Sequence, residues 1–188
     1  PSVTSADPAQ TLARLMAGRR TLVMGVLNVT PDSFSDGGRF FAPQAALEQA
    51  RRMIAEGADI IDIGAESTRP YGDAEPVNAE EEMRRLEPIL PVVCALGIPV
   101  SIDTMKAKVA AWAIEAGATI ANDVWGLQRD PEMARLLAAR HSPVIVMHNR
   151  CRVDADLDII KDIADFFARS LEIADKEINK QRAGHLPT

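Results

Sequence analysis

PVSIDTMKAKVAAWAIEAGATIANDV, residues 99–124, contains one complete strand–helix–strand unit. The runs PVSID and TIANDV are apolar nearly throughout, which is typical of strands in a parallel sheet covered by helices. The segment between them has helical periodicity and ends at Gly117, where a helix stops before the next strand. Polar residues end both strands, Asp103 in the first and Asn122 with Asp123 in the second. The stretch therefore predicts two parallel strands joined by a helix, with polar side chains at their carboxyl ends.

The same unit is repeated along the chain. Further strands are expected at 21–29, 59–65 and 143–149, and further helices at 41–57, 78–97, 130–141 and 155–181. Two of the helices begin with cap signals, Asn78 followed by Glu81 and Asp130 followed by Pro131. Five βα units in series, with no break in composition, indicate a single domain over 1–188. Such an alternation is either a doubly wound sheet or a (β/α)8 barrel.

Two features favour the barrel. No glycine-rich dinucleotide fingerprint follows the first strand. Instead, polar residues stand at the end of every strand: Asn28, then Glu66 with Thr68 and Arg69, then Asp103, then Asn122 with Asp123, then His148 with Asn149. In a barrel these ends meet at one mouth, and a complete barrel takes about 250 residues. Because the chain has 188 residues, we expect about the first five βα units of a TIM barrel, in a domain that is incomplete at its carboxyl end.

The composition is that of a globular protein, with 47% hydrophobic and 26% charged residues and a net charge of −6. That charge argues against nucleic-acid and anionic-membrane partners, because both call for a basic surface. The first ten residues lack the pattern of a signal peptide. Cys94 and Cys151 have no metal-ligand spacing and are expected to be free thiols. We therefore expect a cytoplasmic protein that binds neither nucleic acid nor a membrane.

Four motifs stand in order at the strand ends: NVTPDSFSDGG (28–38), GAESTRP (64–70), SIDT (101–104) and ANDV (121–124). Together they closely resemble dihydropteroate synthase, over residues 20–180. Most of the specificity lies in the long first motif. That family is the sulfonamide target of folate biosynthesis and condenses 6-hydroxymethyl-7,8-dihydropterin pyrophosphate with p-aminobenzoate, giving 7,8-dihydropteroate and pyrophosphate. The resemblance implies a transferase with these small-molecule substrates, Mg²⁺ as cofactor and a homodimer.

Asp103 and Asn122 end adjacent strands, so their side chains can project into one pocket. A carboxylate beside an amide complements the edge of a planar heterocycle that has donor and acceptor nitrogens. By resemblance these two residues hold the pterin ring; the alternative for Asp103 is a cap on the following helix. Met147, whose counterpart packs on the pterin, is either a wall of the pocket or ordinary core. Asp62 lies within a strand, where it either contacts the pterin or makes a structural hydrogen bond.

The pyrophosphate is expected to contact Asn28, Thr68 and Arg69, since hydroxyl and guanidinium donors suit a departing anion. In the family, the asparagine that matches Asn28 helps to bind the Mg²⁺ that accompanies pyrophosphate. A lone asparagine is compatible with this role, because Mg²⁺ keeps several waters and takes further oxygens from substrate phosphates.

The first motif has an aromatic residue, Phe34, among serines, aspartates and glycines, where an ordinary surface turn needs none. By resemblance, Phe34 and Pro70 form the p-aminobenzoate site, and an aromatic face suits a flat aryl amine. Asp36 and the two glycines after it fit a segment that closes over the mouth. The alternative is that Phe34 packs under its own loop in every state.

The implied reaction is a substitution at the pterin methylene carbon, in which pyrophosphate leaves and the aryl amine attacks. Asp103 and Asp36 are expected to stabilise developing positive charge and Arg69 the leaving group, so these three are the catalytic candidates. Further functional residues of the family follow strands six to eight, and we therefore expect the 188-residue chain alone to be inactive. Two alternatives stay open: a pterin-dependent methyltransferase on the same barrel, and a non-catalytic pterin-binding fragment or paralogue.

Overall fold

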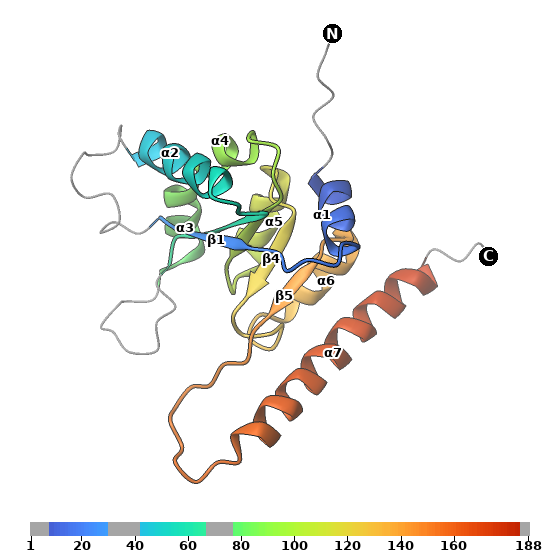
Figure 1. Ribbon diagram of the computed structural model, residues 1–188. Coiled ribbons are helices and arrows are strands. Elements are labelled where there is room, and N and C mark those ends of the chain that lie inside the picture. Colours follow the sequence, from blue (N-terminus) through green and yellow to red (C-terminus); the bar gives the residue numbers. More distant parts are fainter. Residues whose placement is uncertain (1–7, 30–41, 67–76, 185–188) are drawn as a thin grey trace.

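The computed structural model describes residues 8–29, 42–66 and 77–184 (Figure 1). In these ranges the elements follow one another as α1 (Pro8–Met16), β1 (Met24–Asn28), α2 (Ala42–Ala55), β2 (Ile60–Gly64), α3 (Ala79–Leu86), α4 (Leu90–Cys94), β3 (Val100–Asp103), α5 (Ala107–Glu115), β4 (Ile120–Asp123), α6 (Pro131–Arg140), β5 (Val144–Val146) and α7 (Ile159–Gly184). The predicted alternation of strands and helices is therefore present.

The strands form one parallel sheet in the order β1-β2-β3-β4-β5. Each strand lies inside its predicted range. The fifth, predicted over 143–149, is only three residues long. The order never reverses within the described sheet, whereas a doubly wound sheet reverses at its switch point. Consecutive parallel pairing is the arrangement from which a barrel is built.

The two faces of the sheet differ in chemistry. Parallel partners point to the same face, so Asp62 and Ser101 share one row, and Asn28, Gly64, Asp103 and Asn122 share the next. Alternate residues on the other face are apolar and fully buried under the helices, among them Leu27, Ile61, Ile63, Val100 and Ile102. The outer face therefore holds the main core, and the inner face carries the polar side chains.

At the amino-terminal end of the strands the inner face is also apolar. Ile60 and Ile120 form a small cluster with Leu12 of α1, a helix that the sequence analysis did not predict. The guanidinium of Arg20, which follows α1, forms an ion pair with Asp59 just before β2, and Asp59 also accepts the N–H of Val23 at 3.0 Å. Helix α1 thus covers this end of the inner face (Figure 1).

The single helix predicted over 78–97 is wrong: the chain forms α3 and α4, with a break before Leu90. Pro91 stands in the first turn of α4, where a missing N–H does no harm, and it cannot continue a helix from α3. The predicted caps are confirmed. Asn78 accepts the N–H of Glu81 at 2.8 Å, and Asp130 accepts the N–H of Glu132 at 3.0 Å.

Helix α7 runs beside α6 (Figure 1) and is 26 residues long. It begins four residues later than predicted and turns two buried residues, Phe166 and Ser170, toward the body of the molecule. Neither α7 nor any other helix in the described ranges is both long and apolar enough to cross a membrane.

Candidate active site

Three predicted residues lie together on the inner face, Asp62 in the middle of β2 and Asp103 and Asn122 toward the carboxyl ends of β3 and β4. Asp103 and Asn122 are in register on neighbouring strands. The amide of Asn122 donates to Asp62 Oδ2 at 3.1 Å, so Asp62 makes the structural hydrogen bond that the sequence allowed. The other carboxylate oxygen of Asp62 remains available for a ligand.

Three of the four buried side-chain atoms without a partner in the described residues lie at the same place, and the fourth is Glu82 Oε1 on α3. Asp62 Oδ1, Ser101 Oγ and Asp103 Oδ1 are buried and have no hydrogen-bond partner among the described residues. Leaving a buried polar atom unpaired costs roughly 1–3 kcal/mol, so such groups usually have a reason to be present. A bound planar heterocycle with donor and acceptor nitrogens would satisfy them. Ser101 was missed in the sequence analysis, although strand alternation in PVSID places it on the face of Asp103.

The pKa of Asp103 is raised to about 7, first by burial and then by the neighbouring carboxylates of Asp62, Glu82, Asp123 and Glu66. Asp103 therefore changes its protonation state close to neutral pH. A carboxyl group of this kind is suited to respond to a ligand, because approaching positive charge or N–H donors favour the ionised form. Electrostatics thus single out Asp103 among the residues of this cluster.

Burial also raises the pKa of Asp62, while the hydroxyl of Ser101 and the amide of Asn122 act in the opposite direction. The Ser101 hydroxyl, in register with Asp62, favours the ionised carboxylate but does not reach hydrogen-bond geometry with it. Both groups therefore lie side by side on the inner face, each with an oxygen that has no hydrogen-bond partner among the described residues.

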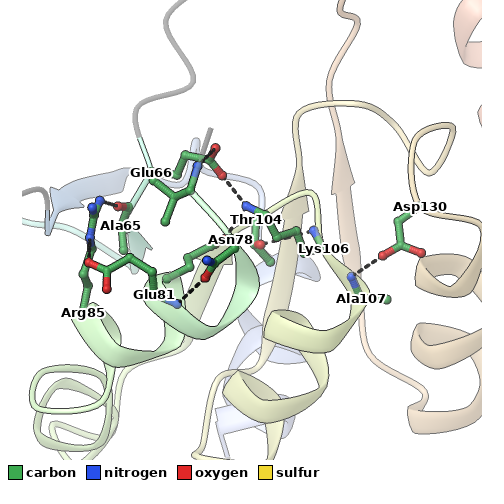
Figure 2. A network of polar contacts seen from close by, with 11 residues as sticks. Ala65, Glu66, Asn78, Glu81, Arg85, Thr104, Lys106, Ala107 and Asp130 are labelled. Atoms are coloured by element: carbon green, nitrogen blue, oxygen red, sulfur yellow. Dashed lines mark hydrogen bonds and ion pairs between the residues drawn. The ribbon is translucent and has the colours of Figure 1, made fainter. Parts of the chain in front are cut away.

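The local backbone leaves room for the Asp103 carboxylate. A Cβ atom at Gly64, the residue in register on β2, would lie 3.2 Å from Asp103 Oδ2. The alternative role of Asp103 as a helix cap is not observed, since α5 begins at Ala107 without a side-chain cap on its N-cap residue, Lys106. The N–H of Ala107 is accepted instead by Asp130, at 2.8 Å (Figure 2).

Met147 follows β5 and is 45% exposed, so it does not belong to the described core. Its backbone N–H donates to the carbonyl of Asp123 at 3.2 Å, which ties the residue to the end of β4. The role of this side chain as a wall of the pterin pocket stays a prediction.

Asn28 ends β1 in an exposed position and is in register with Gly64. Its amide offers an oxygen ligand of the kind that Mg²⁺ prefers. The described residues contain no group of three or more His, Cys, Asp or Glu side chains that could hold a metal ion. Mg²⁺ at Asn28 stays a prediction, with which a single amide oxygen is compatible, because Mg²⁺ takes its other ligands from water and phosphate.

The remaining predicted residues, Phe34, Asp36, Thr68, Arg69 and Pro70, lie outside the described residues. The first segment follows Val29, and the second is flanked by Glu66 and Val77. Glu66 Oε1 accepts the N–H of Val77 at 3.1 Å, so the two flanks of the second segment meet.

A family model described as pterin binding enzyme matches residues 24–182. The chain therefore belongs to the family of pterin binding enzymes. Dihydropteroate synthase of Bacillus subtilis is 49% identical over 156 residues, which make up 82% of this chain and 54% of the relative. The crystal structure of dihydropteroate synthase from Clostridium difficile in the presence of pteroic acid is 46% identical, with a TM-score of 0.80 over 85% of this chain and 60% of that one. The enzyme from Xanthomonas albilineans, solved with 4-aminobenzoic acid, is 39% identical, with a TM-score of 0.78 over 85% of this chain and 57% of that one.

These similarities confirm the predicted resemblance to dihydropteroate synthase and the predicted fold class, five βα units of a TIM barrel. They do not favour the methyltransferase or the non-catalytic alternative. The chain spans between 54% and 60% of the length of the three relatives.

Proposed function

We propose that the chain supplies the pterin-binding part of a dihydropteroate synthase, which joins 6-hydroxymethyl-7,8-dihydropterin pyrophosphate to p-aminobenzoate and releases pyrophosphate. The observation that carries the proposal is the group of buried, unpaired polar atoms on Asp62, Ser101 and Asp103 beside the amide of Asn122. Similar proteins have been solved with pteroic acid, which contains both the pterin and the p-aminobenzoate part of the product, and with 4-aminobenzoic acid, one of the two substrates.

In this proposal the pterin ring lies on the inner face, with its edge toward Asp103 and Asn122 and with Met147 and Asp62 at its border. When the methylene carbon loses pyrophosphate, positive charge spreads over the pterin. An ionised Asp103 stabilises that charge more than it stabilises the neutral substrate, which is the condition for accelerating the step. Its pKa near 7 lets the approaching pterin draw the group into the ionised form.

The leaving pyrophosphate is assigned to Asn28, Thr68 and Arg69, and the aryl amine to Phe34 and Pro70, with Asp36 as a second carboxylate near the reacting carbon. A Mg²⁺ ion bound at Asn28 would supply charge neutralisation for the pyrophosphate. Asn28 orients the anion at the end of β1, on the same row of the inner face as Asp103. A homodimer and a cytoplasmic location are further parts of the proposal.

The test is a pyrophosphate-release assay with dihydropterin pyrophosphate, Mg²⁺ and p-aminobenzoate. It compares the 188-residue chain with the same chain joined to the carboxyl-terminal part of the Bacillus subtilis relative that it does not span. We expect turnover from the completed protein and none from the chain alone. Replacing Asp103 by Asn in the completed protein should lower kcat by roughly 100-fold.

The matched control is Glu115→Gln, which removes an exposed carboxylate that pairs with Arg140 on the outside of α5 and α6. This variant should keep the turnover of the completed protein. A folded completed protein that binds the pterin without turnover would establish the non-catalytic alternative instead. Sedimentation of the completed protein tests the proposed dimer.

A further inference from the structure

A partly buried ion network lies beside the strand end that carries Asp103. The ammonium of Lys106 contacts the carboxylate of Glu66 (Figure 2). The same ammonium lies 2.6 Å from Glu82 Oε2. Glu82 is fully buried on α3, Glu66 follows β2, and Lys106 is three residues beyond Asp103. One cation therefore joins three elements next to the candidate site.

The network also closes a chain connection. One oxygen of Glu66 contacts Lys106, and the other accepts the N–H of Val77 at 3.1 Å. Arg85 of α3 donates to the carbonyl of Ala65 at 2.9 Å, which adds a second tie between the end of β2 and α3 (Figure 2). Glu66 thus ties the end of β2 to the backbone that leads into α3.

Helix α5 does not need the Lys106 side chain in order to begin. The backbone N–H of Lys106 donates to Thr104 Oγ1 at 3.3 Å, and the N–H of Ala107 donates to Asp130. Nor is a buried ion pair a good source of stability, since replacing one by apolar groups of similar volume is often neutral or favourable. Neither the start of α5 nor stability therefore explains why Lys106 pairs with two carboxylates here.

We propose that Lys106 is a positioning residue of the pterin site: its ammonium holds Glu66, and through Glu66 the entry to α3, against the strand end that carries Asp103. The same cation compensates Glu66 and Glu82, two of the carboxylates that face Asp103. This inference rests on the proposed function for its effect on binding, but the positioning itself is a property of the ligand-free protein.

Loss of the Lys106 ammonium has two separate consequences, one for the pKa of Asp103 and one for the position of Glu66. Asp103 is faced by Asp62 and Glu66 from β2 and its end, by Glu82 from α3 and by Asp123 from β4, and these carboxylates raise its pKa. Without Lys106, Glu66 and Glu82 act on Asp103 uncompensated, so its pKa rises further. Without the ammonium, Glu66 also loses the contact that holds it in place as the acceptor of the Val77 N–H.

The test compares Lys106→Met with Lys106→Arg and with the matched control Lys108→Met. Lys108 lies on the same helix and pairs with Glu80, but both side chains are more than 60% exposed. In Lys106→Met we expect the Asp103 carboxyl, followed by ¹³C NMR in the ligand-free protein, to titrate at higher pH. We expect the Val77 amide to exchange with solvent roughly tenfold faster, the effect of losing one charge-assisted hydrogen bond. Lys106→Arg should restore both values in part, and Lys108→Met should change neither.

If Lys106→Met does not fold, the double variant Lys106→Met, Glu82→Gln takes its place, because it no longer leaves a buried charge without a partner. The exchange rate of the Val77 amide in this double variant still tests whether Lys106 holds Glu66 in place. Affinity for the pterin pyrophosphate is then measured in the completed protein, where a variant with a freed Val77 amide should bind roughly tenfold more weakly. A folded variant with an unchanged Asp103 titration and an unchanged Val77 amide would overturn the inference. Absence of pterin binding by the unsubstituted protein would instead overturn the proposed function and leave both ligand-free measurements valid.

Discussion

Asp103 differs from an ordinary surface aspartate because it is buried and lies near four other carboxylates. Its pKa of about 7 in the folded protein lies above the ordinary value of 3.8. Between these two values the folded protein binds more protons than the unfolded chain, so this group lowers stability as the pH rises. Below the unfolded value both states are protonated and the effect disappears.

Asp103→Asn should therefore stabilise the protein at high pH and not at low pH. The expected gain in the free energy of unfolding is up to about 4 kcal/mol at pH 8, because each pH unit between the two pKa values contributes about 1.4 kcal/mol. Urea unfolding of both proteins at pH 4 and pH 8 measures it. A gain of the same size at both pH values would contradict the proposed origin of the effect.

Gly64 is the second residue on which the geometry of the site depends. Gly64→Ala would place a Cβ atom 3.2 Å from Asp103 Oδ2 and 3.3 Å from Asp103 Cβ, so the Asp103 side chain has to move. We expect pterin affinity, measured by calorimetry on the completed protein, to fall by roughly tenfold with a loss of stability near 1 kcal/mol.

Gly25→Ala is the matched control for that substitution. Its new Cβ meets Met53 on the opposite, helix-covered face, at 2.9 Å from Sδ. It should cost stability in the core without weakening the binding of the pterin. Equal losses of affinity in the two variants would show that strand distortion, and not displacement of Asp103, is responsible.

At the scale of elements, the turn after β4 joins the sheet to α7. The carboxylate of Asp123 accepts the N–H groups of Trp125 at 2.9 Å and Leu127 at 2.8 Å, and Gly126 and Leu127 both have positive φ. A Cβ at Gly126 would come within 2.8 Å of Ser170 Oγ on α7. The buried carboxylate of Asp123 thus fixes the conformation of the turn, and α7 packs closely against it.

Gly126→Ala should lower the free energy of unfolding by about 2 kcal/mol, because the left-handed backbone and the contact with α7 both resist a side chain. Thermal or urea unfolding measures the loss. Gly184→Ala, at the end of α7, meets no atom within 4 Å and should be neutral or slightly stabilising. A loss of similar size in both variants would mean that the close packing at the turn contributes nothing.

Most of these elements could be predicted from the sequence because their signals are local. A strand buried on both faces reads as a short apolar run, and Asn78 and Asp130 mark helix starts through bonds to residues two or three positions away. Helix α1 could not be predicted in this way, because it is stabilised by a contact between distant parts of the chain. Its Leu12 packs against residues 60 and 120.

In the candidate site too, local signals predict some residues, and only the packing of distant elements places the others. Asp103 and Asn122 could be predicted because they end strands, and parallel strands bring their ends together. Glu82 and Lys106 could not, because glutamate and lysine normally face solvent, and only the packing of α3 against α5 buries Glu82 beside a partly covered Lys106. The raised pKa of Asp103 depends on the same packing.

At the scale of the whole molecule, burial declines from the centre of the sheet toward β5. All five residues of β2 are buried, whereas all three of β5 are only partly buried. β1 and β5 are the outer strands of the described sheet, and an outer strand has partners on one side only. We therefore expect β5 to open locally while β2 and β3 open only with global unfolding.

Hydrogen exchange of two amides with comparable bonds tests this expectation. The Ile61 N–H donates to the Pro99 carbonyl at 3.1 Å in the centre of the sheet, and the Met147 N–H donates to the Asp123 carbonyl at 3.2 Å just beyond β5. In the 188-residue chain, Met147 should exchange on the order of 100-fold faster than Ile61, after correction for intrinsic rates. Joining the carboxyl-terminal part of the Bacillus subtilis relative should slow Met147 and leave Ile61 unchanged, if that part adds a strand beside β5. Equal protection of both amides in the chain alone would mean that β5 already belongs to the cooperative core, and that the pterin wall at Met147 is formed without any further strand.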